Sequence, residues 1–308
     1  MKKISIVAFA AFLLVGCATQ FEVKPSIPLN VDVSGKQKVY HASVTYYNQN
    51  DFGITESIDE IDARVLRVAL QGTSYYKWIS YKIRSFRPAE SIAAKMEYRT
   101  DSAEKWRDYQ PAVGFDYLME GIAVDENGNL SKIPNVDSIP RDMDGFKFYV
   151  SLIDFHSWDI YRHTFFNPAE LKLNEKPLKK VGDTVTVSLE AKPIPLLEWE
   201  NLTSDLRMEG GIIVGLYLAD GVVNGTESRI VYFEQNQRIK QYVYGSVGGI
   251  LLKMPYEGTT RFFGHIFVDQ SDELLKAHFN EYVYGKVSAP MGVKVIVHTK
   301  REYRVEVE

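Results

Sequence analysis

The sequence predicts a mainly β fold, with antiparallel, sandwich-like sheets and two notable helices at about residues 54–70 and 271–283. Tyr and Phe, which favour strands, account for 19 and 16 of the 308 residues. Most apolar segments alternate with a period of two, and Gly-containing turns separate the short segments of the C-terminal half. A period of 3.6 residues occurs only in the two stretches named above, which are therefore predicted as helices.

The N-terminus carries a short apolar segment that ends in the only cysteine of the chain. Lys2 and Lys3 precede an apolar run from Ile4 to Val15. This run is shorter than the roughly 20 residues that a membrane-spanning helix needs. A positive start, a short apolar stretch and a small residue before a potential cleavage point are typical of a secretory signal peptide.

The tetrapeptide Leu14-Val15-Gly16-Cys17 resembles the lipobox of bacterial lipoproteins, and the resemblance covers residues 1–17. It implies that residues 1–16 are a signal peptide and that the Cys17 thiol carries diacylglycerol. It also implies cleavage before Cys17 and a third acyl group, such as palmitate, on the new amine. Ala18 stands where an Asp would retain an enteric-type lipoprotein at the inner membrane. We therefore expect a protein that is lipid-anchored at the cell outer membrane, on its periplasmic or its surface face.

Composition excludes several classes of partner and site. The net charge is −4, whereas binding to a nucleic-acid backbone requires clustered Lys and Arg. Nucleic acid is therefore not expected as a partner. If Cys17 carries lipid, no cysteine remains for a disulfide, a nucleophile or a metal site.

The mature chain is predicted to contain a tether and two domains. Residues 17–36 include Pro25, Pro28 and Gly35 and are expected to form an extended, lipidated tether. Residues 37–190 are predicted to form a β-rich domain with one helix. Residues 191–308 are predicted to form a β-sandwich-like domain, since prolines at 193 and 195 interrupt the chain near this boundary.

In the first domain, the helix over 54–70 is predicted from apolar residues at spacings of three and four, namely Ile54, Ile58, Ile61, Val65 and Val68. Acidic residues occur early in this stretch, and Arg64 and Arg67 occur late, as the helix dipole favours. Alternating residues predict strands over 75–83, 146–152 and 184–189.

In the second domain, short strands are predicted over 212–218, 228–233, 238–244, 249–254, 261–268 and 292–299. Turns are expected at glycines such as Gly221, Gly245 and Gly258, and at Asn224-Gly225. Ser271 to Glu273 would begin the helix over 271–283. The tetrapeptide Tyr-Val-Tyr-Gly occurs at 242–245, within a predicted strand, and again at 282–285, at the predicted helix end.

No catalytic, cofactor or metal site is predicted. Asp154, His156, Asp159 and His163 lie within ten residues, and on a helix His156, Asp159 and His163 would share a face that could hold a metal ion. The residues before them alternate as a strand, which would place Asp154 and His156 on one face and Asp159 and His163 on the other. Glu198 and Glu200 flank Trp199, and a strand would place their carboxylates about 6–7 Å apart. That distance lies between the separations of retaining and inverting glycosidases.

We therefore expect an outer-membrane-anchored lipoprotein with a non-catalytic binding or structural role in the cell envelope. Its partner would be an envelope protein or a glycan. The alternative is an envelope hydrolase that acts on glycan or peptidoglycan, with Glu198 and Glu200 as its first candidates. Tyr242 and Tyr244 are predicted to contact the partner, because a strand places both on one face and large aromatic residues dominate many interfaces.

Overall fold

The structure is a computed structural model that describes residues 36–49, 54–70, 73–86, 105–119, 139, 143–171, 173–189, 207–247 and 250–308. Its strands are β1 (Lys36–Gln49), β2 (Thr55–Leu70), β3 (Thr73–Phe86), β4 (Arg107–Asp108), β5 (Asp116–Met119), β6 (Thr184–Leu189), β7 (Arg207–Val223), β8 (Thr226–Val247), β9 (Ile250–Val268), β10 (Leu274–Ser288) and β11 (Lys294–Val307). Its helices are α1 (Met143–Phe166) and the short 3-10 turns η3 (Gln110–Ala112), η5 (Pro168–Leu171) and η6 (Pro290–Gly292).

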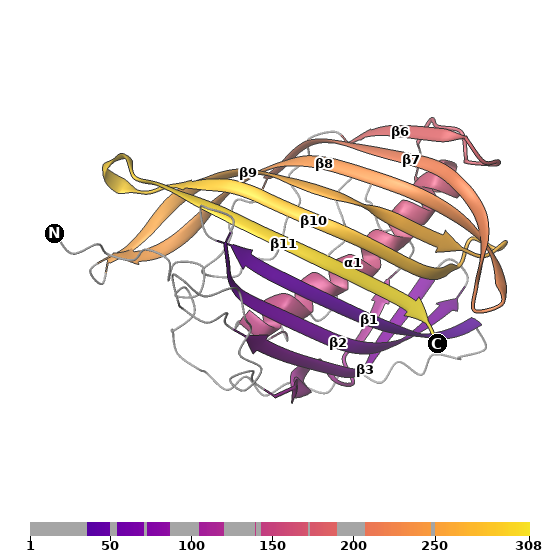
Figure 1. The fold of residues 1–308 in the computed structure, drawn as a ribbon, viewed down its shortest axis with the longest axis horizontal. Coiled ribbons are helices and arrows are strands. Elements are labelled where there is room, and N and C mark those ends of the chain that lie inside the picture. The colour runs from indigo at the N-terminus through magenta and orange to yellow at the C-terminus, as the bar shows by residue number, and fades with distance from the viewer. Residues whose placement is uncertain are drawn as a thin grey trace.

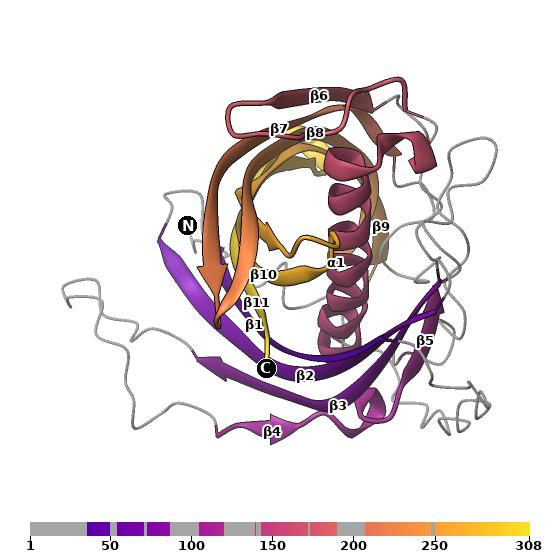
Figure 2. The same cartoon turned by 90° about the vertical axis from the view of Figure 1, so that its right-hand side faces the viewer.

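The strands form a single sheet in the order β4-β3-β2-β1-β11-β10-β9-β8-β7-β6, with β5 also paired to β3. All the strand pairs in the described chain are antiparallel. The predicted mainly β, antiparallel class is confirmed. The sheet curves around α1, which lies along its concave side (Figures 1 and 2). The layers are thus one curved sheet and one helix, instead of two facing sheets.

The two predicted domains both contribute strands to this sheet. β1 pairs with β11 from Tyr40↔Val307 to Gln49↔His298, and β6 pairs with β7. The boundary predicted at 190/191 lies outside the described residues, so the division into domains stays a prediction. Cys17, Glu198 and Glu200 also lie outside them.

The helix predicted over 54–70 is wrong, because these residues form strand β2. Within the strand, Ile61 and Val65 face the core. Near each end, two consecutive residues are buried: Ile58 with Asp59, and Arg67 with Val68. Burial of both faces at the strand ends shifts the apolar positions out of strict alternation and produces spacings of three and four. The charged residues find partners across strands and on α1, as Lys147 Nζ does with Asp59 at 3.3 Å.

The helix predicted over 271–283 is also wrong, because strand β10 begins at Leu274. Residues 269–273 form the turn before it. Asp269 Oδ1 accepts hydrogen bonds from the backbone N–H groups of Ser271 and Glu273, at 2.8 and 3.0 Å. Leu274 and Leu275 are both buried beside a register shift, and the residues after them alternate between the two faces. The helix-like apolar stripe is therefore divided between opposite faces of a strand.

The strand predicted over 146–152 is wrong, since these residues belong to α1. The apolar alternation over 146–152 is too short to distinguish the period of two of a strand from the period of 3.6 of a helix. The buried face of the helix shows a helical repeat over its whole length, with Phe148, Leu152, Phe155, Trp158, Tyr161 and Phe165 all in the core. The strands predicted over 75–83 and 184–189 are confirmed as parts of β3 and β6.

Most of the strands predicted for the C-terminal half are fragments of longer ones. Gly245 and Gly258, predicted as turns, lie within β8 and β9. The turn at Asn224-Gly225 is confirmed: φ is +50° and +80°, values that favour Asn and Gly, and it joins β7 to β8. In the described part of the chain, no helix is both long and apolar enough to cross a membrane.

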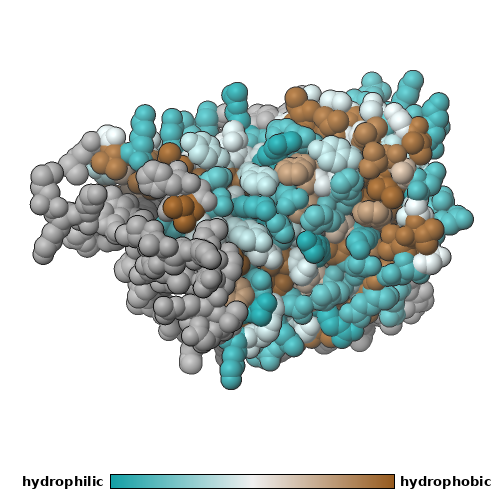
Figure 3. Space-filling model, viewed as in Figure 1, coloured by the Kyte–Doolittle hydropathy of each residue, from teal (hydrophilic) through white to brown (hydrophobic). Residues whose placement is uncertain are grey.

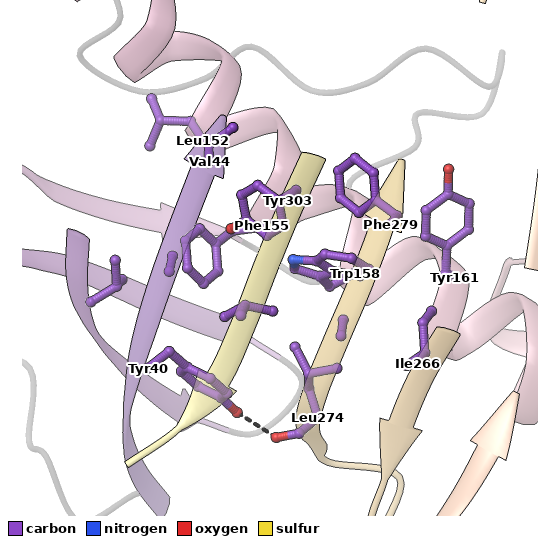
Figure 4. Packing of buried hydrophobic residues seen from close by; sticks show 14 of the residues in the cluster. Tyr40, Val44, Leu152, Phe155, Trp158, Tyr161, Ile266, Leu274, Phe279 and Tyr303 are labelled. Carbon is purple, nitrogen blue, oxygen red and sulfur yellow. Dashed lines mark hydrogen bonds between the residues drawn. The ribbon is translucent and has the colours of Figure 1, made fainter. Parts of the chain in front are cut away.

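Two glycines of the sheet have close neighbours: a ring of α1 at Gly215, and the backbone of β10 at Gly264. A Cβ at Gly215 would lie 2.5 Å from the Phe165 ring, and a Cβ at Gly264 would lie 2.0 Å from the backbone oxygen of His278. Gly264 pairs with Phe233 on one side and Phe279 on the other. Trp158 packs against the Phe233 ring at a centroid distance of 6.5 Å and against the Phe279 ring at 5.1 Å. Figure 4 shows Trp158 beside Phe279. The concave side of the sheet is thus occupied by the helix and the core that it covers.

Candidate binding surface

The outer face of the sheet, turned away from α1, carries a hollow of about 460 Å³ over β1, β9, β10 and β11. Strand register builds it from two neighbouring rows of outward-facing residues. In the first row His265 lies opposite His278, His278 opposite Arg304, and Arg304 opposite Ser43. The second row contains Phe267, Lys276, Glu306 and His41. We call the space lined by these eight residues the histidine hollow.

The acids near the histidine hollow already have partners. Lys276 Nζ donates to Glu306 at 2.8 Å, and Asn224 donates to the other oxygen of Glu306 at 3.3 Å. His41 Nε2 lies 2.6 Å from Asp62. Arg304 is exposed and makes no ion pair with any residue that the structure describes. Among the described residues, the hollow therefore presents the unpaired Arg304 guanidinium group and, besides the His41 ring paired with Asp62, the imidazole rings of His265 and His278.

Burial lowers the pKa of both His265 and His278 below the ordinary value. For His278 the nearby positive charge of Arg304 lowers the pKa further, whereas Glu302 opposes the shift. The two rings are therefore mainly neutral near pH 7, and an anion placed between them would favour their protonation.

A group of aromatic side chains, Tyr47, Phe263, Tyr282 and Tyr284, lies further along the same strands on the outer face, in the three cross-strand rows next to the histidine hollow. Phe263 and Tyr282 stack with centroids 5.8 Å apart. Lys300 lies 5.1 Å from the Tyr47 ring and 6.0 Å from the Tyr282 ring. Tyr282 and Tyr284 remain 36% and 53% exposed. Figure 3 shows this side of the molecule, where hydrophilic side chains predominate over the middle of the sheet.

Tyr242 and Tyr244 lie in β8, opposite Pro255 and Lys253. Their side chains are outside the described ones, so their contact with a partner stays a prediction. The second Tyr-Val-Tyr-Gly tetrapeptide lies in strand β10, and the side chains of Tyr282 and Tyr284 are exposed to solvent. Sequence reasoning missed this pair because it assigned them to a helix end. Period-two alternation from Ala277 onward was the signal that could have identified them.

On the inner face, a buried ionic network joins α1 to the sheet. Arg301 donates to Asp154 on α1 and to Glu281 on β10, each at 2.7 Å. Thr260 also donates to Glu281, at 3.0 Å. The Asp154 and Arg301 side chains are each 4% exposed. Burial raises the pKa of Asp154 to about 7, although Arg301 favours its ionised form. A substrate cannot reach these groups without displacing the helix, so we interpret the network as structural.

A second network fastens the turn between β9 and β10 to the C-terminal end of α1. Glu273 pairs with Arg67 and with Arg162 of α1. Asp272 pairs with Arg229. Asp154 and His163 are thus engaged in or beside networks of arginines, and no group of three or more potential metal ligands is present among the described residues. The structure therefore brings no metal site together from the cluster at 154–163 as far as it is described.

No protein-family model matches the chain, and no curated relative matches it. Among solved structures, the outer membrane channel DcaP of Acinetobacter baumannii matches with 8% sequence identity and a TM-score of 0.21, over 89% of this chain and 96% of that chain. A TM-score this low does not establish a shared fold, so no property of that channel is transferred to this protein.

Proposed function

We propose that the protein is an outer-membrane lipoprotein that acts by binding, with the outer face of its sheet as the contact surface and an envelope protein or glycan as its partner. The observation that carries this proposal is the contrast between the two faces. The concave face is filled by α1, whereas the outer face exposes Tyr282 and Tyr284 beside cationic side chains. Rigid aromatic rings with neighbouring cations are favourable contact groups for proteins and for sugars.

Lipid anchoring is the first part of the proposal, and the sequence from Leu14 to Cys17 supports it. Cys17→Ser should abolish incorporation of radioactive palmitate and release the protein from membranes or leave it unprocessed, because only a thiol can form the thioether. Fractionation and labelling of cells would measure this result. A Cys17→Ser variant that still incorporates palmitate would contradict the proposal.

The contact surface is the second part of the proposal. Changing both Tyr282 and Tyr284 to Ala should reduce retention of the partner at least about tenfold, as truncation of central aromatic contacts commonly does. Because both rings are substantially exposed, the thermal transition should stay within a few degrees of that of the native protein. The measurement is quantitative mass spectrometry of proteins and glycans that co-purify with the tagged lipoprotein from envelopes.

The matched comparison is the double change of Tyr242 and Tyr244 to Ala in β8. If only this pair reduces retention, the contact surface lies at β8 and the assignment to β10 is wrong. Cleavage of peptidoglycan or a polysaccharide by the purified protein, abolished by Glu198→Gln or Glu200→Gln, would replace the binding role with a hydrolase.

A further inference from the structure

We propose that the histidine hollow binds a phosphate group, with Arg304 and Lys276 as its charged contacts and His265, His278 and Ser43 as hydrogen-bond donors. This inference deepens the proposed function and rests on it only in taking the outer face as the binding surface. It names the chemistry of one ligand group, which could be esterified in a lipid headgroup or a glycan or be free in solution.

The first support is the convergence of donors from several strands. Residues that face each other on adjacent antiparallel strands have Cβ atoms about 4.5–5.5 Å apart. His265, His278, Arg304 and Ser43 are consecutive in one such row, and Lys276 stands in the next row on β10. Adjacent members of this row, such as His278 and Arg304, are close enough to approach different oxygens of one tetrahedral anion. Because regular strands hold these residues, binding of the anion requires ordering of side chains only and not of the backbone.

The second support is the charge of the hollow. The charge of Lys276 is shared with Glu306, but that of Arg304 has no acid partner among the residues that the structure describes. The planar guanidinium group matches two phosphate oxygens at once. A metal cation would instead be repelled by Arg304 and Lys276, and it would have to displace Glu306 from its two hydrogen bonds.

The histidines give the site a dependence on pH. The charged and titratable groups facing His265 and His278 are Tyr232 on β8, Lys276 on β10, and Glu302 and Arg304 on β11. Burial lowers the pKa of both rings, and for His278 the charges of Arg304 and Lys276 lower it further, so both rings are mainly neutral near pH 7. Since a bound anion favours the protonated rings, its affinity should rise as the pH falls from about 8 to about 6. Inorganic sulfate, which keeps its charge over this interval, is the probe for this effect.

The experiment is titration calorimetry of the detergent-solubilised full-length protein with inorganic phosphate, glycerol phosphate and acetate. Phosphate or its glycerol ester should bind more tightly than acetate. Arg304→Gln should weaken this binding about tenfold or more, the loss expected for a hydrogen-bonded ionic contact. Lys82→Gln is the matched control: Lys82 is exposed on β3 in the same cross-strand row and lies outside the hollow. This change should alter the affinity less than about twofold.

Tighter binding of glycerol phosphate than of inorganic phosphate identifies an esterified ligand, and the reverse order identifies the free anion; both outcomes support the site. Acetate binding as tight as phosphate, absence of phosphate binding, or an equal effect of Arg304→Gln and Lys82→Gln would overturn the inference. The double variant of Tyr282 and Tyr284 should keep its phosphate affinity. If phosphate fails to bind but this double variant still loses its partner, only the phosphate inference is wrong.

Discussion

Replacing Trp158 by Ala is expected to lower the free energy of unfolding by about 3–5 kcal/mol, the usual cost of removing a buried aromatic side chain. Trp158 is 3% exposed. Its ring contacts Phe279 and Tyr303, at centroid distances of 5.1 and 5.6 Å, in the middle of the layer between α1 and the sheet. The cavity left by the missing Trp158 ring cannot collapse easily, because the strands that pack against α1 at this point belong to a continuous sheet.

Chemical unfolding followed by circular dichroism would measure this loss, and Trp106→Ala is the matched control. Trp106 is 40% exposed and stacks on Arg84 at 4.3 Å, outside the buried core. Its replacement should cost no more than about 1 kcal/mol. Equal losses for the two variants would show that α1 is not packed on the sheet as described.

Arg301→Met is expected to cost about 3–5 kcal/mol, because it leaves the buried Asp154 carboxylate and the partly buried Glu281 carboxylate without this cation. Each carboxylate lies 2.7 Å from the Arg301 guanidinium group. Arg261→Met removes an arginine from an ion pair with Glu234 on the outer face, where the Arg261 side chain is 51% exposed. This control should cost no more than about 1 kcal/mol. If Arg301→Met lowered the free energy of unfolding as little as Arg261→Met, the Arg301 network would have to be solvated instead of buried.

The same network predicts the sign of a pH dependence. Folding raises the pKa of Asp154 from 3.8 to about 7. Between these values the native state binds more protons than the unfolded state, so this group's contribution to stability is present below about pH 4 and is lost as the pH rises toward 7. Asp154→Asn should remove the part of the pH dependence of stability that this carboxyl group causes. Unfolding free energies of both proteins between pH 4 and 8 would measure it; identical pH profiles would contradict the raised pKa.

Local patterns predicted the parts of this fold that local chemistry determines. The Asn224-Gly225 turn and the alternation in β3 and β6 were identified because each depends on neighbouring residues. Strand β2 was mistaken for a helix since both of its faces are buried at its ends, on the inner face by contacts with distant parts of the chain. For example, Arg67 at one end is buried against Glu273 of a distant turn. Such tertiary burial changes the apparent period and cannot be seen in one segment.

The candidate site was less predictable than the fold class. The histidine hollow depends on the register of four strands, which brings His41 and Arg304 together from opposite ends of the chain. No local spacing encodes that juxtaposition. The exposed pair Tyr282 and Tyr284 had a usable local signal, but Leu274 and Leu275 at the start of β10 imitated a helix and obscured it.

The pairing of β1 with β11 has a consequence for how the molecule is made. β11 is the last strand of the described chain, yet it stands between β1 and β10 within the sheet. Until it is in place, the strands on its two sides form separate halves, each with an open edge toward the missing strand. Pairs such as Tyr40↔Val307 close a very long loop, and such contacts slow folding. A chain cut before Lys294 should therefore expose two unpaired edges and aggregate.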